Sequence, residues 1–161
     1  SKKSIPVTVD LDGNTIPVNI PAGSAFDANT LPDDSRGDIA TGDVAVPLIK
    51  LAWARSGDKG NHANIGVIAR KTEYLPFIKA ALTEAAVGHY MRHTFDDQAS
   101  VKVWELPGIS ALNFLLENSL GGGGICSLRI DPQGKAYAQQ LLDFPVPVSQ
   151  EIIQSLSNSQ D

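Results

Sequence analysis

Short stretches in which apolar and polar residues alternate predict β-strands along much of the chain. Residues 5–21 alternate around an Asp-Gly-Asn turn at 12–14, and their three prolines confine this β-ribbon to an edge or an extended arm. Further strands are predicted over 46–54, 65–69, 101–104, 125–130 and 136–146. The last two form a pair, because the sequence Asp-Pro-Gln-Gly at 131–134 favours a type I turn between them.

Apolar residues spaced by three or four positions predict two helices. The first covers 75–93, with Pro76 suited to its first turn and Thr83–Glu84 as the place where it would break in two. The second covers 109–118. A short, fraying helix is expected after Pro147.

Strands interleaved with two helices predict an α+β domain in which the helices cover one face of a sheet. The other face then needs a cover, which the N-terminal ribbon or another subunit could supply. Residues 22–43 have few large apolar side chains, as in a linker or an acidic mobile loop. We therefore expect a ribbon and acidic linker over 1–44, a compact domain over 45–148 and a C-terminal tail over 149–161.

Composition narrows the class of protein. The chain has 161 residues, 42% hydrophobic and 19% charged, which suits one globular core. Its net charge of -5 lacks the basic footprint of a nucleic-acid-binding protein. No apolar run of membrane-spanning or signal-peptide type is present, and the lone Cys126 cannot close an intrachain disulfide. These features predict a soluble, cytoplasmic protein that binds neither nucleic acid nor membrane.

The densest polar cluster covers residues 55–64, between two predicted strands. Its glycines let successive backbone N–H groups turn inward, and Arg55 and Lys59 add positive charge suited to a carboxylate or phosphate. The candidate ligand-binding residues here are Arg55, Ser56, Gly57, Lys59, Gly60, Asn61 and Asn64.

Three interpretations of this cluster remain open. It binds a ligand or partner; it is a purely structural hairpin; or Asp58 and His62 act as acid and base. A carboxylate so close to arginine and lysine is more often an ion-pair partner that orders the loop. Ser56 is not part of a G-x-S-x-G motif, so a hydrolase triad has no support.

Four consecutive glycines, Gly121, Gly122, Gly123 and Gly124, form the second candidate site. Each costs roughly 0.5–1 kcal/mol to order relative to alanine, which indicates a close approach by a ligand, a strand or a partner chain. A flexible connector is the alternative. The run precedes a predicted strand and lacks the lysine and hydroxyl residue of a P-loop, so nucleotide binding is disfavoured.

Single residues outside these two clusters give weaker evidence for a functional site. Asn113, on the second predicted helix, faces solvent or a specific buried partner, and Arg129 either points toward the Arg55 region or forms an edge salt bridge. His89 and His93 are four residues apart but lack further ligands nearby, so no metal site is predicted. Cys126 has no evident base and is expected to be a small packed residue. No cofactor is predicted.

Several strings resemble those of the AtuA-like (acyclic terpene utilisation) ferredoxin-fold domain family in order and spacing. They include Leu-Ala-Trp-Ala-Arg-Ser-Gly-Asp-Lys-Gly at 51–60, Ala-Asn-Ile-Gly-Val-Ile-Ala-Arg at 63–70 and Leu-Gly-Gly-Gly-Gly at 120–124. Glu-Leu-Pro at 105–107, Ala-Leu-Asn-Phe at 111–114 and Ser-Leu-Arg at 127–129 follow the same pattern. The similarity covers about residues 46–146. Asn61 and His62 depart from it, because the family more often has Asp followed by a small or basic residue.

The resemblance implies a ferredoxin-like sandwich with one mostly antiparallel sheet. It also implies a stand-alone small chain that accompanies a larger AtuA-like chain in catabolism of acyclic terpenoids or branched acyl-CoA or carboxylic acids. Lyase or hydratase-type chemistry would then lie mainly on the larger chain. The alternatives are a homo-oligomeric module that binds acyl-CoA or carboxylate without catalysis, and an independent small enzyme that uses Asp58 and His62.

Overall fold

The chain forms two compact units, Ser1–Asp34 and Ser35–Asp161. The computed structural model describes residues 6–20, 40–96 and 100–158. Most of the expected acidic linker, 22–43, lies outside the described residues. Within the described ranges, no helix combines the length and apolarity needed to span a membrane.

The first unit contains the predicted ribbon, a hairpin of β1 (Val7–Leu11) and β2 (Asn14–Val18). Asp12 and Gly13 both have positive φ angles, 50° and 80°, as a two-residue type I′ turn requires. The strand register places five apolar side chains on one face of the hairpin, each 39–59% exposed: Val7, Val9, Leu11, Ile16 and Val18. This confirms the ribbon and shows that it is amphipathic.

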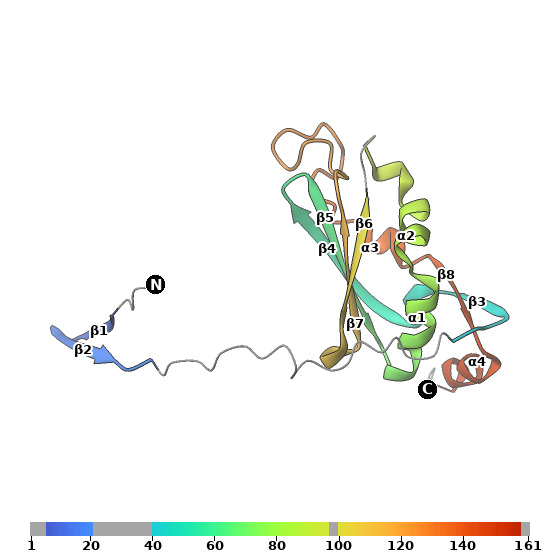
Figure 1. The fold of residues 1–161 in the computed structure, drawn as a ribbon, viewed down its shortest axis with the longest axis horizontal. Helices are drawn as coiled ribbons and strands as arrows, with labels where there is room; N and C mark the ends of the chain where they lie inside the picture. The colour runs from blue at the N-terminus through green and yellow to red at the C-terminus, as the bar shows by residue number, and fades with distance from the viewer. Residues whose placement is uncertain (1–5, 21–39, 97–99, 159–161) are drawn as a thin grey trace. The chain divides into compact units, whose positions relative to one another are not determined.

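A four-stranded antiparallel sheet is the centre of the second unit (Figure 1). Its strands, in spatial order, are β4 (Ala52–Lys59), β5 (His62–Ala69), β7 (Ala111–Leu116) and β6 (Val101–Leu106). Successive side chains along each strand point to opposite faces of the sheet, so one set lies in the core and the other set lies on the opposite face. That opposite face is called the outer face below.

Helices α1 (Leu75–Ala81) and α2 (Glu84–Tyr90) lie on the core side of the sheet (Figure 1). The predicted break between them is confirmed: the Thr83 hydroxyl accepts a hydrogen bond from the Ala86 N–H and caps α2. Among the described residues, four short 3-10 turns join the elements: Leu48–Lys50, Thr72–Tyr74, Arg92–Thr94 and Pro107–Ile109.

The core lies between the sheet and these helices. Its fully buried side chains come from alternate strand positions and from one stripe of α1 and α2. They include Ile65, Val67, Phe114, Leu116, Ile78, Leu82 and Val87. The expected α+β class, one antiparallel sheet with helices on one face, is confirmed, but both covering helices come from the segment predicted as the first helix, 75–93.

The helix predicted over 109–118 is wrong: residues Ala111–Leu116 form β7, a central strand paired on both sides. Leu112, Phe114 and Leu116 are buried, whereas Asn113 and Leu115 lie on the outer face, so the true period is two. The apolar spacing of this segment fits both periods. Pairing with β5 and β6 decides between them, because an interior strand satisfies its backbone groups on both edges.

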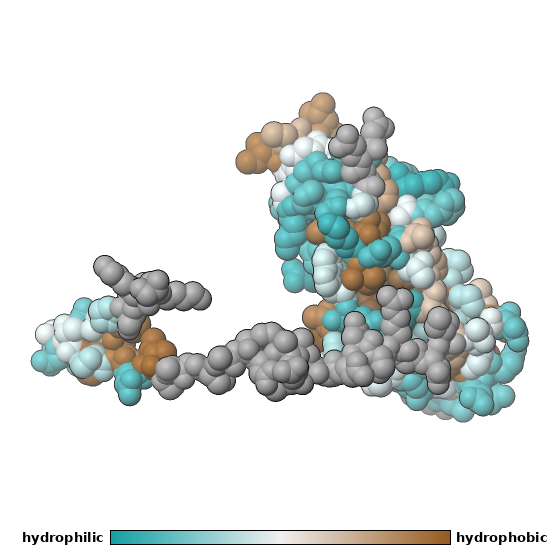
Figure 2. Space-filling view, in the orientation of Figure 1, coloured by the Kyte–Doolittle hydropathy of each residue, from teal (hydrophilic) through white to brown (hydrophobic). Residues whose placement is uncertain are grey.

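The strand pair predicted over 125–130 and 136–146 is also wrong. Residues 121–136 contain neither helix nor strand, and Ile125, Leu128 and Ile130 are fully exposed at the tip of this loop, the brown tip in Figure 2. The turn at 131–134 is present, with the Asp131 carbonyl accepting from the Gly134 N–H. However, the Asp131 carboxylate accepts from the N–H groups of Lys135 and Ala136, which leads into a helix rather than a strand.

That helix is α3 (Tyr137–Leu141), followed by β8 (Pro145–Val148) and α4 (Gln150–Ser157). β8 pairs with β3 (Val44–Pro47) in a separate two-stranded sheet. The strand expected over 46–54 is therefore divided, because the 3-10 turn at Leu48–Lys50 separates β3 from β4. The helix expected after Pro147 is confirmed.

Candidate functional site

The polar cluster of the sequence forms the β4–β5 hairpin, and its outer face carries the candidate site. Alternation places Arg55, Gly57 and Lys59 of β4 on this face. The register sets Gly66 opposite Arg55 and Asn64 opposite Gly57. Two glycines therefore lie between cationic and amide side chains.

These glycines leave a shallow depression of about 360 Å³. A Cβ atom added at Gly66 would come no closer than 3.9 Å to a neighbour, the carbonyl oxygen of Arg55, so the space above Gly66 is open. A Cβ atom added at Gly57 would come within 3.2 Å of the Lys135 Nζ atom, which reaches this strand from the loop before α3. The depression is lined by Arg55, Ser56, Gly57, Asp58, Lys59, Asn64, Gly66 and Lys135.

Three of the lining side chains are cations, and they differ in how they are held. Lys59 donates hydrogen bonds to the Asn64 Oδ1 atom (3.1 Å) and to the Asp58 carbonyl (2.9 Å). The Lys135 Nζ atom lies 3.7 Å from the Asp58 carboxylate. The lining therefore contains three cationic residues and one acidic residue, Asp58, whose carboxylate lies near Lys135, and the depression is net positive.

Arg55 is the exception among the described arginines. Arg70 donates to the Ile49 carbonyl and stacks on Trp53, while Arg92 and Arg129 donate to carbonyl groups. The exposed Arg55 guanidinium makes no hydrogen bond, ion pair or ring contact with any described residue. Its donors are available for a planar anion.

Lys102, on the neighbouring part of the outer face, is neutralised by Glu117. The Lys102 ammonium donates to the Glu117 carboxylate at 2.8 Å, and the Ser100 hydroxyl donates to the same group. The hydrogen bond from Lys102, followed by that from Ser100, holds the pKa of Glu117 below its usual value. Lys102 therefore adds no net charge to the outer face beside the depression.

Ser56 has a structural role. Its buried hydroxyl accepts from the Ala138 N–H (2.9 Å) and donates to the Lys135 carbonyl (3.2 Å). Both bonds tie the start of α3 to β4, so Ser56 positions the backbone that carries Lys135.

The two acid–base candidates are not brought together. Asp58 lies on the face of β4 that carries Ser56, whereas His62 pairs with Lys59 on the outer face. The His62 Nδ1 atom accepts a hydrogen bond from the Asn118 N–H at 2.9 Å. His62 is therefore held at the hairpin end and does not line the depression.

Asn113 has a specific partner on the outer face. Its Oδ1 atom accepts from the Asn64 Nδ2 atom at 3.2 Å, and Asn64 in turn accepts from Lys59. This chain of polar groups runs from the depression to β7 and orients the Asn64 amide.

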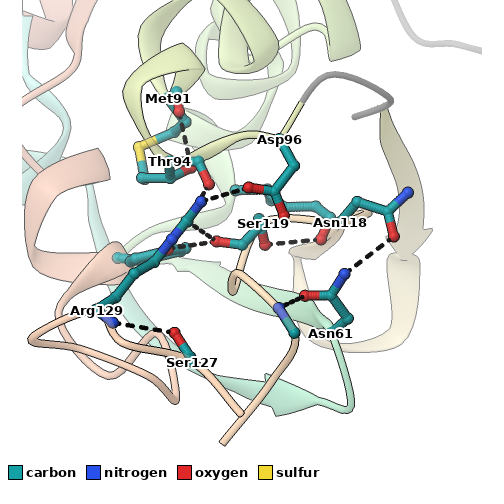
Figure 3. A network of polar contacts seen from close by, with 11 residues as sticks. Asn61, Met91, Thr94, Asp96, Asn118, Ser119, Ser127 and Arg129 are labelled. Carbon is teal, nitrogen blue, oxygen red and sulfur yellow. Dashed lines mark hydrogen bonds and ion pairs between the residues drawn. The ribbon is translucent and has the colours of Figure 1, made fainter.

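The hairpin turn and the glycine run, both candidate binding sites, contact each other (Figure 3). The Asn61 Oδ1 atom accepts from the Gly122 N–H, and the Asn61 carbonyl accepts from the Ser119 and Leu120 N–H groups. A Cβ atom added at Gly123 would lie 2.6 Å from the Gly60 carbonyl oxygen. The close approach expected at the glycines is thus made by the chain itself.

The glycine conformations fit this packing. Gly121, Gly122 and Gly123 have φ angles of 63°, 101° and 85°, a region that other residues rarely adopt. Gly124 has neither a positive φ nor a close neighbour, so the structure gives no reason for glycine there.

Arg129 attaches the loop to the rest of the domain (Figure 3). Its guanidinium donates to the carbonyls of Thr94 and Ser119 and forms a 2.7 Å ion pair with Asp96. A Cβ atom at Gly121 would lie 2.9 Å from the Arg129 Nε atom. Arg129 makes these contacts within its own domain and does not line the depression with Arg55.

Sequence reasoning missed Lys135 and Gly66. Lys135 was missed because the segment after residue 125 was wrongly predicted as a strand pair. Gly66 lies between buried Ile65 and Val67, so strict alternation along this strand indicates an outer-face glycine.

The histidine pair forms no metal centre in the structure. His93 contacts the Gln140 Oε1 atom, and His89 lies beside Arg92. No group of three or more potential ligands among His, Cys, Asp and Glu occurs within the described ranges.

Comparison with known proteins identifies the family. Residues 46–147 match the model of the AtuA ferredoxin-like domain, which covers the β4–β5 hairpin, the glycine run and Lys135. Searches of curated proteins and of solved structures gave no match. Because the matched region is more than half of the chain and the antiparallel sheet with its helices agrees with it, the chain belongs to the AtuA ferredoxin-like domain family.

Proposed function

We propose that this chain is a small subunit or accessory domain of an AtuA-like enzyme system, in which it binds an anionic group of the substrate. The observation that carries the proposal is the unpaired Arg55 guanidinium beside a two-glycine floor. The substrate class, an acyclic terpenoid or branched acyl-CoA or carboxylic acid, comes from the family resemblance.

The chemistry of the depression suits a carboxylate or phosphate. A guanidinium offers two parallel N–H donors to such a group, and an arginine–anion hydrogen bond is roughly twice as strong as a neutral one. Lys59 and Lys135 add positive charge at the rim, while Gly57 and Gly66 let the anion approach the sheet. The pairing of Lys135 with Asp58 is long, at 3.7 Å, so an incoming anion can compete for it.

The reaction itself is assigned to a larger AtuA-like chain, with lyase or hydratase-type chemistry. Asp58 and His62, the acid and base considered above, lie on different faces of the hairpin, and His62 is engaged by Asn118. The described lining residues therefore offer charge for binding and orientation without an adjacent acid–base pair.

The exposed loop supports binding to another protein chain. Ile125, Leu128 and Ile130 each have about 100% of their side-chain surface exposed, while Arg129 between them is anchored in the fold. A fixed loop with three fully exposed aliphatic side chains is typical of a docking element, since single exposed residues are common but such clusters are not.

The proposal is tested by mixing the chain with the large AtuA-like protein from the same source and measuring mass by light scattering after size exclusion. We expect a stoichiometric complex, and we expect Leu128→Lys to weaken it. Ile49→Lys is the control, because Ile49 is also an exposed aliphatic residue but lies outside the loop. Two separate peaks at all concentrations would contradict the subunit role.

A second candidate function is a homo-oligomeric acyl-CoA or carboxylate-binding module without catalysis. The apolar side chains on the outer face of the sheet favour it, because they suit self-association. In that case the chain alone would bind the anion with full affinity, whereas a subunit that shares its site would bind weakly until its partner is added.

A further inference from the structure

The outer face of the sheet is cationic toward one end and apolar toward the other, and the two regions meet in the row of Arg55, Gly66, Asn113 and Trp104. One end holds the cationic depression. The other, here called the apolar half, consists of Trp53, Ile68, Trp104 and Leu106, which are 54%, 42%, 49% and 40% exposed. Strand register places Trp53, Ile68, Ala111 and Leu106 in one row across all four strands.

We infer that the apolar half is a contact surface for a second copy of this chain, in a two-fold symmetric dimer. Tryptophan is enriched in the centres of protein interfaces, and two of them on one sheet face are costly to leave in water. Both tryptophans of the chain lie in this patch.

The size of the apolar half fits such a contact. Two half-exposed tryptophans with two half-exposed aliphatic side chains present on the order of 400 Å² of apolar surface. A standard interface buries about 800 Å² per partner, of which about 65% is apolar in homodimers. The polar side chains and backbone around the patch would supply the remainder.

Repulsion between like charges restricts the orientation in which two outer faces can pack. Two outer faces that overlapped along their whole length would bring the Arg55, Lys59 and Lys135 clusters of both copies together, which like-charge repulsion disfavours. A two-fold axis that crosses the strands at the apolar half instead stacks the apolar row of one copy on that of the other. The two cationic depressions then point in opposite directions. This arrangement is self-complementary and closed, as an isologous dimer requires.

Packing geometry permits the contact. Two sheets stack about 10 Å apart with their strands within about 30° of each other, and this needs flat, interdigitating side chains. Ala111, in the middle of the apolar row, is only 3% exposed, so the larger side chains beside it form the contact surface. The dimer would leave both anion-binding depressions open, so this inference does not depend on the proposed function.

The test uses the two tryptophans as built-in reporters in the full chain. Mass by light scattering and tryptophan emission are measured over a dilution series for the wild type, Ile68→Lys and Ile49→Lys. Ile68 and Ile49 are matched at 42% and 45% exposure, but Ile49 lies outside the outer face. Circular dichroism checks that each variant folds.

We expect the wild type and Ile49→Lys to have twice the mass of one chain and blue-shifted emission that moves to longer wavelength on dilution. Ile68→Lys should weaken the dimer more than about tenfold, because it would bury an unpaired charge. A wild-type monomer at high concentration would overturn the inference, whatever its emission. A dimer that survives Ile68→Lys unchanged would also overturn it, since it would use another surface.

Discussion

At the scale of single residues, pairing separates the cations that are free to bind a ligand from those that are not. Lys102 and Arg129 are each neutralised by a carboxylate, from Glu117 and Asp96. Arg55 has no such partner among the described residues, and its side chain is exposed. Water therefore satisfies its donors in the free protein, and a bound anion would replace that water with charge-assisted hydrogen bonds.

Substitution of Gly57 should reduce ligand affinity strongly and change the stability of the fold only slightly. Gly57→Val would place branched carbon atoms where Lys135 now reaches over β4, because even a Cβ atom would lie 3.2 Å from the Lys135 Nζ atom. We expect roughly tenfold weaker anion binding by calorimetric titration, with a small change in melting temperature. Gly108→Val is the control, since a Cβ atom there meets nothing within 4 Å. Equal affinity in both variants would contradict the placement of Lys135.

Glu117 should contribute to the pH dependence of stability. Its folded-state pKa is lowered chiefly by the hydrogen bond from Lys102, so its contribution is present above the ordinary carboxyl pKa of about 4.3 and is lost as pH falls through the lowered value. Lys102→Met should therefore raise the pKa of Glu117 and move acid unfolding to higher pH. Carboxyl NMR titration measures the first effect; Lys50→Met, at an exposed lysine outside the sheet, should leave the Glu117 pKa unchanged.

At the scale of elements, the site depends on how the β4–β5 hairpin is fixed at its turn. Asn61 contacts Asn118, Ser119 and Gly122 through its side chain and backbone, so the turn is attached to the segment after β7. Ser56 attaches the other end of the same loop to β4 through the start of α3. Both attachments hold Lys135 and Arg55 in one depression.

The glycine contact predicts a specific difference between two substitutions. Gly60 and Gly123 both have positive φ angles, 68° and 85°, so each alanine variant should lose about 1 kcal/mol from backbone strain. Gly123→Ala should lose clearly more, because its Cβ atom would overlap the Gly60 carbonyl, whereas the Cβ atom of Gly60→Ala meets nothing within 4 Å. Urea denaturation measures both; equal losses would contradict the close packing.

Arg129 should act on stability and not on ligand affinity. Arg129→Met would leave the Thr94 and Ser119 carbonyls without their donor and Asp96 without its ion pair, so we expect a loss of about 2–3 kcal/mol in the free energy of unfolding. Arg92→Met, at an exposed arginine on a helix end, should lose less than about 1 kcal/mol. A stable Arg129→Met protein with lost anion binding would reverse the assignment.

The sequence predicts elements well where local signals and tertiary pairing agree. The ribbon turn at Asp12–Gly13 and the helix break at Thr83 each rest on local chemistry, and both are confirmed. β7 was missed because its apolar spacing suits a helix as well, and only its pairing with β5 and β6 resolves this. The Arg55 cluster was predicted from residue types, whereas Lys135 joins it across 80 residues, which no local pattern encodes.

At the scale of the whole molecule, charge and apolar surface are unevenly distributed. Residues 1–44 carry seven acidic and three basic groups, a net charge of -4, so the remaining 117 residues carry only -1 of the total of -5. The second unit presents three distinct surfaces: the cationic depression, the apolar half of the sheet and the loop tip at Leu128. We expect substitutions at one surface to leave the functions of the others intact.

The most direct test of the central claim is a calorimetric titration of the wild type, Arg55→Gln and Arg92→Gln with a panel of carboxylates and acyl-CoA esters. We predict that at least one anion binds the wild type and Arg92→Gln equally, and that Arg55→Gln binds it about 10–100-fold more weakly, as expected for the loss of a charged hydrogen bond. Ligand at 100 times its dissociation constant should also stabilise the fold by about 2.7 kcal/mol. Unchanged affinity in Arg55→Gln, or no binding of any anion by the wild type with or without the large AtuA-like chain, would contradict the account.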